Sequence, residues 1–382
     1  EKDLKIVDFE GKIDASDFHL DGFVHDYSFW MQPDLNGDVD LDISLKSSNL
    51  KLKNLLTYNG VNYLPEEYRD EELSNLEMHF TSGMHYIDST LHSIDLDLDK
   101  LTAKMKIHPQ QFHDFRGNIH YEDEHIVIKD FHGEIGETNF NFDLNYYLGN
   151  DQDIKKRDNY FALNADYIDY DALFNFNLND SVPDEKSVIP TTEDVTAHAE
   201  AFNIYELPFT DMQLKANIKH FINRNLDVKN IVADFRTTPD HFIYIDTLSM
   251  DAAGGKVALN GYFNGSNPQK IYFKPDLVLD NVDLDKLLFK FENFGQEHIV
   301  SDNLQGRLTT RIKGNIRVYP DLVPDLDQSE LEMDVKVLNG RLKNYNPMLA
   351  LSDYMGDKNL QNVRFDTLKN NLVVKEGRIN IP

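Results

Sequence analysis

The chain contains no cysteine, which excludes disulfides and thiolate metal sites. It also lacks any run of about 18 apolar residues, so no segment is expected to span a bilayer as a helix. Basic residues are few, because 38 Lys and Arg against 66 Asp and Glu leave a formal net charge of −28. Without a basic stripe to meet phosphates, nucleic acid is excluded as a partner. The acidity also disfavours electrostatic docking onto anionic lipid headgroups, and we expect it to keep a strand-rich surface soluble.

Catalytic signatures are missing as well. The chain has no Gly-x-Ser-x-Gly elbow, no His-Glu-x-x-His pair and no phosphate-binding loop. We therefore expect a protein that is not an enzyme and that needs no cofactor.

Histidine is the one plentiful metal-ligating residue type, at 14 residues. The densest group is His108, His113, His120, His125 and His132, and its spacings match no zinc pattern. Odd spacings alternate faces on a strand, so neighbours in this group should point apart. We expect histidines on a solvated sheet face and no metal site.

The acidic segment 34–40 also suggests calcium, but its glycine and its twelfth residue do not fit the EF-hand loop. A hairpin at Asn36-Gly37 explains this segment better. Incidental weak cation binding by rows of acids is the alternative.

Strict alternation of apolar and polar residues dominates the chain. It runs through residues 37–46, 92–99, 139–146 and 174–178. A period of two predicts strands with one apolar and one solvated face, and such strands belong to antiparallel sheets. Helical signal is limited to residues 285–291, 347–355 and, more weakly, 65–76, while 185–194 is typical of a solvated loop.

One phrase recurs three times, at Asn49–Leu56, Tyr167–Phe174 and Asn281–Leu288. The copies start 167 − 49 = 118 and 281 − 167 = 114 residues apart, and each is a strand end followed by an apolar pair suited to one helical turn. Repetition at this spacing predicts an elongated array of units of about 115 residues. The predicted divisions are a partial first repeat at 1–60, a second at 61–180, a third at 181–295 and a truncated C-terminal segment at 296–382.

The C-terminal quarter has a distinctive order of short motifs. A glycine-containing strand leads into a helix begun by proline in Leu338–Met348, and a Leu-Ser pair follows in Leu351–Tyr354. Two further strands, Val363–Leu368 and Val373–Ile379, contain a Phe-x-x-Leu and a Gly-x-Ile pattern. In these motifs and their order the segment resembles the AsmA-like family. Earlier parts of the chain show the same order of glycine, strand, turn and strand, so the resemblance covers most of the sequence.

The resemblance implies a mainly β fold, a long twisted antiparallel sheet bent into a groove. It also implies a place in the periplasm of a Gram-negative bacterium, tethered to the inner membrane by an N-terminal helix that this chain lacks. Since the chain opens with Glu1, we interpret it as an excised piece. The implied function is guidance of phospholipids between the inner and outer membranes, in support of outer-membrane integrity. The implied partners are phospholipid acyl chains, the membranes at both ends through parts outside this chain, and other envelope proteins.

The alternating strands supply the candidate groove residues, which share the apolar side of their strands. They are Val39, Leu41, Ile43, Ile94, Leu96, Leu98, Ile126, Ile128, Phe140, Phe142, Leu144, Ile243, Ile245, Val257 and Leu259. The alternative for each position is plain sheet core beneath a helix or a second sheet.

Two other functions fit parts of the pattern. A scaffold or assembly factor for outer-membrane proteins would use an open sheet edge. A carbohydrate-adhesive solenoid would need aromatic ladders on the solvated face, whereas Tyr and Phe here fall mostly in the apolar register.

Overall fold

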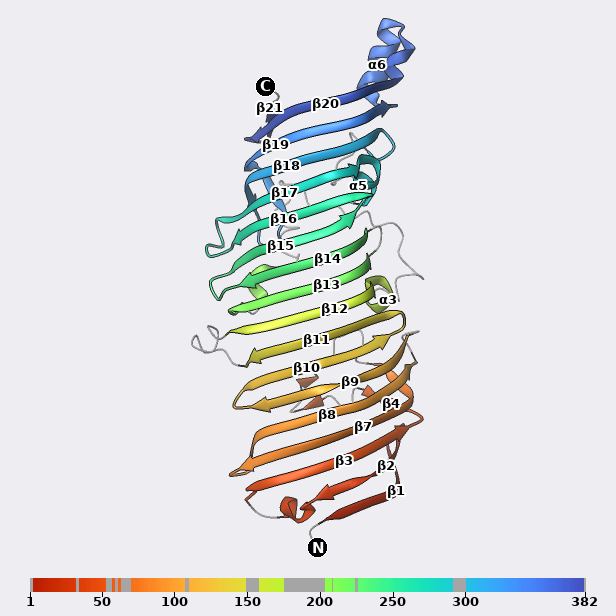
Figure 1. Cartoon of the computed structure of the whole chain (residues 1–382), viewed down its shortest axis with the longest axis vertical. Helices are drawn as coiled ribbons and strands as arrows, with labels where there is room; N and C mark the ends of the chain where they lie inside the picture. Colours follow the sequence, from red (N-terminus) through yellow and green to blue (C-terminus); the bar gives the residue numbers. More distant parts are fainter. Residues whose placement is uncertain are drawn as a thin grey trace. The chain divides into compact units, whose positions relative to one another are not determined.

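The computed structural model describes residues 3–31, 34–52, 57–58, 61–62, 70–106, 110–148, 158–174, 203–207, 209–223, 226–290 and 300–380. Figure 1 shows the strands of the chain, coloured along the sequence. The chain divides into two compact units. Unit 1 comprises Glu1–Ile154 and Asp158–Ser181, and unit 2 comprises Lys155–Arg157 and Val182–Pro382. The predicted repeat divisions within them stay predictions.

Unit 1 is built on one antiparallel sheet in which neighbours along the chain are mostly neighbours in space. Its strands are β1 (Leu4–Ile13), β2 (Ser16–His25), β3 (Gly37–Ser47), β7 (Glu72–Ile87), β8 (Thr90–Met105), β9 (Gln111–Glu122), β10 (His125–Ile135), β11 (Thr138–Tyr147) and β12 (Asn159–Asp169). The two-residue strand β4 (Leu50–Lys51) extends the pairing of β7, and β5 (Thr57–Tyr58) pairs with β6 (Val61–Asn62). A 3-10 turn, η1 (Tyr27–Met31), lies between β2 and β3.

Unit 2 has the same plan, with each strand antiparallel to the next. Its strands are β13 (Met212–Asn223), β14 (Leu226–Thr237), β15 (Phe242–Ala252), β16 (Gly255–Asn264), β17 (Ile271–Asp283), β18 (Leu304–Val318), β19 (Pro324–Lys343), β20 (Asn362–Lys375) and β21 (Arg378–Asn380). Two 3-10 turns, η4 (Ile204–Glu206) and η6 (Lys358–Gln361), accompany them.

The prediction of a mainly β, antiparallel fold with few short helices is confirmed. Residues 37–46 lie in β3, 92–99 in β8 and 139–146 in β11, where the alternation gives each strand one apolar face. The fourth predicted strand fails at its start, because Phe174 ends a helix, and its other residues lie outside the described part of the chain. No helix among the described residues has both the length and the apolar content needed to cross a membrane.

The recurring phrase forms a strand end followed by a short helix in its second and third copies. Strand β12 leads into α3 (Tyr170–Phe174), and β17 leads into α5 (Leu284–Lys290). The apolar pair supplies buried residues in each helix, Leu173 in α3 and Leu287 and Leu288 in α5. In the first copy, residues 53–56 lie outside the described part, as does the predicted loop at 185–194.

The other helix predictions have mixed outcomes. A third helix, α6 (Asn346–Met355), confirms the prediction at 347–355. The predicted helix at 65–76 is wrong from Glu72 onward, where β7 begins. There Leu73 and Leu76 are buried against β4 and β8, and strand pairing overrides the local helical preference.

Strand pairing is interrupted at several places by bulges, some of which have Asp or Asn as their central residue. Asp8, Asp130 and Asn281 have φ values of 53°, 48° and 53°, in the left-handed region that short polar side chains tolerate. Each bulge lets apolar residues three apart share a face, as in Ile128-Lys129-Asp130-Phe131, where Ile128 faces Leu144 and Phe131 faces Phe142.

The backbone N–H that each of these bulges removes from the ladder is satisfied by the neighbouring strand. Asp8 donates to Asp21 Oδ1 at 2.8 Å, and Asp130 donates to Asp143 Oδ1 at 2.9 Å. Asn281 donates to Thr309 Oγ1 at 3.1 Å. The bulge is therefore a built element that keeps the apolar pattern in register along strands longer than one alternating run.

We predict that Asp130→Val lowers the stability of unit 1 by about 1–2 kcal/mol, since a β-branched residue is strained at positive φ. Asp130→Asn, which keeps a short polar side chain at the same φ, is the matched control and should unfold close to the wild type. Thermal and urea unfolding followed by circular dichroism measure both. Equal losses in the two variants would contradict this account of the bulge.

Candidate functional site

In unit 1 a continuous row of residues crosses the sheet from β2 to β12, each residue directly opposite the next. The row, named here the unit 1 floor, is Val24, Leu41, Ser82, Leu96, Ile119, Ile128, Leu144 and Phe161. Directly opposed residues point to the same face of an antiparallel sheet. The floor is thus one surface drawn from strands β2 to β12, and it is apolar except at Ser82.

The structure brings all the predicted groove residues of unit 1 onto this face. Two further rows run parallel to the floor. In one, Met84 lies directly opposite both Val39 and Ile94, and in the other, Phe80 lies directly opposite both Ile43 and Leu98. The remaining predicted residues lie on the same face in strands β10 and β11. Ile126 lies opposite Tyr121, which in turn lies opposite Ile94. Phe142 lies opposite Phe131, and Phe140 lies opposite Gly133.

Unit 2 has an equivalent row, named here the unit 2 floor. It consists of Ala216, Ala233, Leu248, Leu259, Leu277, Ile312, Met333 and Leu372, again in directly opposed pairs. The predicted residues Ile243, Ile245 and Val257 lie on the same face as Leu259, opposite Phe263, Gly261 and Met250.

The floors are not sealed. Val39 is fully buried at 0% exposure, so at this position core packing is observed. Every other predicted groove residue is only partly buried and keeps some of its side chain open to solvent. Whether lipid occupies these positions stays a prediction.

Apolar clusters flank the unit 1 floor at both ends of its strands. At one end Val24 and Val39 pack with Tyr27 and Leu35 from the η1 connection. At the other end lies a larger cluster of buried residues, Leu50, Leu52, Leu73, Leu76, Ala103 and Met105. Both clusters include residues of the floor face, so the segments that carry them lie over that face and leave the floor between two apolar rims.

Unit 2 repeats this arrangement. Ile204 of η4 and Phe209 pack on Phe263 and Ile271 at one end of the strands. At the other end Leu287 of α5 packs on a cluster with Ala253, Leu279 and Val282. The helix of the recurring phrase is therefore a rim element.

Sequence reasoning missed Phe115, Phe131 and Phe161, which pack with the predicted Phe140 and Phe142 on the unit 1 floor face. Phe115 lies 5.7 Å from Phe140 between ring centroids, Phe131 lies 5.1 Å from Phe142, and Phe142 lies 5.6 Å from Phe161. Phe115 and Phe131 each follow an Asp at positive φ, which breaks the two-residue period. The signal that could have found Phe131 is the spacing of three around that Asp, from Ile128.

The opposite face of unit 1 carries histidines paired with aspartates across strands. His85 Nδ1 lies 2.7 Å from Asp38, and His120 Nδ1 lies 2.6 Å from Asp95. His79 lies between two carboxylates, with Nε2 3.0 Å from Asp42 and Nδ1 2.8 Å from Asp99. Cross-strand pairs of this kind stabilise a sheet and fix its register.

The prediction of histidines on the solvated face is confirmed, but the prediction that neighbours point apart is wrong. His113 and His132, opposite Glu134 and Arg116, share the face of His120 and His125. The bulge at Asp114 shifts the alternation by one residue between His113 and His120, and the bulge at Asp130 does the same between His125 and His132. His108 lies outside the described residues.

The expected turn at Asn36-Gly37 is also only partly right. Strands β2 and β3 do pair as neighbours, but residues 26–36 connect them, and Gly37 is the first residue of β3. Asn36 instead accepts the backbone N–H of Asp88 from the β7–β8 turn at 2.9 Å.

Unit 2 carries arginine and lysine pairs with aspartates on its polar face. Arg236 forms two bonds to Asp246, at 2.6 and 3.0 Å. Asp276 accepts Arg311 Nε at 2.7 Å and lies 3.2 Å from Lys313 Nζ. The hydrogen bond from Arg311, with that from Lys313, lowers the pKa of Asp276 from 3.8 to about 2.

No family model, no curated protein and no solved structure matches this chain.

We predict that Arg311→Gln raises the pKa of Asp276 toward its ordinary value near 3.8. Because the folded chain holds this pKa at about 2, below the unfolded value, the contact stabilises unit 2 above about pH 4. That contribution is lost as the pH falls from about 4 toward 2, and the variant should therefore lose the pH dependence in this window.

Carboxyl NMR titration of Asp276 measures the change directly. Lys375→Gln, which removes a different exposed pair with Glu330, is the control and should leave Asp276 unchanged. An Asp276 pKa that stays at about 2 without Arg311 would show that other groups set it.

Proposed function

We propose that the protein handles phospholipids in the envelope of a Gram-negative bacterium, guiding their acyl chains along the apolar floors between the inner and outer membranes. The observation that carries the proposal is the continuous row in each unit, which is apolar apart from Ser82 and in which most side chains are partly exposed. The resemblance to AsmA-like proteins and the division of each sheet into a mainly apolar and a mainly polar face support it. The periplasmic location and the inner-membrane tether are parts of this proposal.

The dimensions and energies suit an acyl chain. Strands in a sheet lie about 4.8 Å apart, so a row across eight strands is on the order of 35 Å long. One acyl chain needs about 15 Å, half of a hydrocarbon core about 30 Å thick. Moving a 16-carbon chain through water unshielded costs on the order of 12 kcal/mol, at about 0.8 kcal/mol per CH₂. An apolar floor between apolar rims removes much of that cost.

The net charge of the protein suits the passage of phospholipids along the floors rather than their storage. A net charge of −28 gives an anionic headgroup no general attraction to the chain, so binding rests on the apolar tails. We propose passive guidance, in which the membranes or partner proteins set the direction.

The second candidate is a scaffold that offers a sheet edge to outer-membrane proteins. Strand β20 favours this candidate, because within the described part of the chain most of its outer edge has no paired strand. The short strand β21 pairs only with Val373, Val374 and Lys375, so that among the described strands residues 362–372 pair with β19 alone. This edge, however, carries exposed Arg364, Asp366 and Lys369, which are the residues that blunt edge pairing in natural sheets. The acyl-chain function is therefore the better supported.

The test compares neighbouring residues on opposite faces of one strand. Ile128 belongs to the unit 1 floor, while Val127 faces His120 and Asn145 on the polar side. Leu277 belongs to the unit 2 floor, while Val278 faces Arg311. Ile128→Asp and Leu277→Asp are the test variants, and Val127→Asp and Val278→Asp are their matched controls.

Each protein is purified from a Gram-negative host and analysed by native mass spectrometry and lipid extraction. We predict that phospholipid co-purifies with the wild type and the controls. The floor variants should retain less of it, by a factor of about ten or more, since removing a carboxylate from water to bind an acyl chain costs several kcal/mol of binding free energy. Circular dichroism shows that each variant is folded. A folded wild type free of lipid, or equal loss in floor and control variants, would contradict the proposal.

A further inference from the structure

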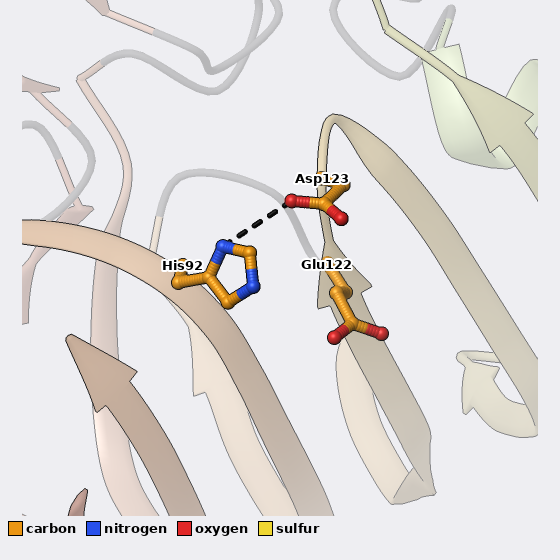
Figure 2. A group of neighbouring side chains, drawn as sticks. All are labelled: His92, Glu122 and Asp123. Carbon is orange, nitrogen blue, oxygen red and sulfur yellow. Dashed lines mark ion pairs between the residues drawn. The ribbon is translucent and has the colours of Figure 1, made fainter. Parts of the chain in front are cut away.

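Three metal-ligating side chains converge on the polar side of unit 1, away from the floor. They are His92 of β8, Glu122 at the end of β9, and Asp123 in the turn to β10 (Figure 2). One ligand atom from each lies within 4.8 Å of the other two, and His92 Nδ1 lies 3.2 Å from Asp123 Oδ1. Within the described part of the chain this is the only such group of three.

A bulge in β8 places His92 there. Ser93 lies opposite His85 and Leu91 lies opposite Tyr86, so His92 is an extra residue without a directly opposed partner in β7. On its other side Ser93 lies opposite Glu122. The bulge thus turns the imidazole toward the end of β9, about thirty positions away in the sequence, where spacing rules could not predict it.

The turn after β9 supplies the second carboxylate. Asp123 and Glu124 have φ values of 48° and 61°, the tight two-residue connection that joins β9 to β10. Asp123 comes directly after Glu122, and the turn leaves both carboxylates beside the imidazole. A second imidazole, His85, lies with its ring centroid 5.8 Å from that of His92.

Other histidines on this face have carboxylates but not this arrangement. His79 contacts Asp42 through Nε2 and Asp99 through Nδ1, so its two carboxylates lie at opposite nitrogens of the ring. That geometry suits a hydrogen-bonded bridge and gives no common point for an ion. His79 is therefore a natural control for the His92 group.

We propose that His92, Glu122 and Asp123 bind a divalent first-row transition ion such as Zn²⁺. One imidazole nitrogen with two carboxylate oxygens is a borderline ligand set that such ions prefer over Mg²⁺ or Ca²⁺, which favour all-oxygen sites. Water completes the coordination, and the negative field of the chain concentrates cations at its surface. The ion cross-links β8 to the β9–β10 turn and stabilises unit 1.

The test is calorimetric titration of ZnCl₂ into the whole chain after treatment with a chelator. We expect one saturable site that millimolar Mg²⁺ does not displace, and a Zn²⁺-dependent rise in the unfolding temperature. His92→Ala and Glu122→Gln should weaken binding at least tenfold and abolish that rise, while His79→Ala should bind Zn²⁺ as the wild type does.

The variants lie at exposed or partly exposed positions, and circular dichroism without metal shows whether each one folds. If a variant fails to fold, the visible absorption spectrum of Co²⁺ bound to the wild type in place of Zn²⁺ reports the coordination of the site directly. Absence of saturable binding by the wild type overturns the proposal. Equal affinity in His92→Ala, or equal loss in His79→Ala, also overturns it, because binding would then belong to the acidic face as a whole.

Discussion

Everything in this structure depends on the register of antiparallel strand pairs. Direct opposition places Leu41, Leu96, Ile128 and Leu144 on one face, and a slip of one residue in any strand would move its apolar residues to the solvated side. The polar face reinforces the same register, with histidine–aspartate pairs in unit 1 and arginine–aspartate pairs in unit 2. Both faces therefore specify one alignment, and the rims on the apolar side add buried clusters at the strand ends.

The sequence was sufficient for the mainly β, antiparallel fold, the apolar face and the short helices α3, α5 and α6, because period-two alternation, the recurring phrase and a proline at a helix start are local signals. Every predicted groove residue lies on one apolar face of its unit. The bulges were not predicted, since a single Asp or Asn at positive φ looks like an ordinary polar residue in the pattern. This failure explains the missed Phe131 and the wrong orientation of neighbouring histidines. The position of His92 was unforeseen because it comes from a different bulge in β8, between the pairs His85–Ser93 and Tyr86–Leu91. The strand start at Glu72 was missed because burial of Leu73 and Leu76 comes from distant strands.

The separation of the two faces gives each a distinct chemistry. The apolar floors lie between rims and stay partly open, which is what passage of acyl chains needs, while their breadth and the absence of a general attraction for anions suit many phospholipids rather than one. The polar faces carry the cross-strand ion pairs and, in unit 1, the proposed transition-metal site at His92, Glu122 and Asp123. The two proposals rest on different residues, so either can fail without the other.

The central claim is that acyl chains lie on the floors. The most direct measurement uses a phospholipid with a photoreactive group in its acyl chain, incubated with the whole chain, irradiated, and followed by peptide mapping of the labelled residues. The account predicts labels on floor residues such as Leu96, Ile128 and Leu277 and none on Val127 or Val278 of the polar faces. Labels spread over both faces, or floors that remain unlabelled while the protein is folded, would contradict it.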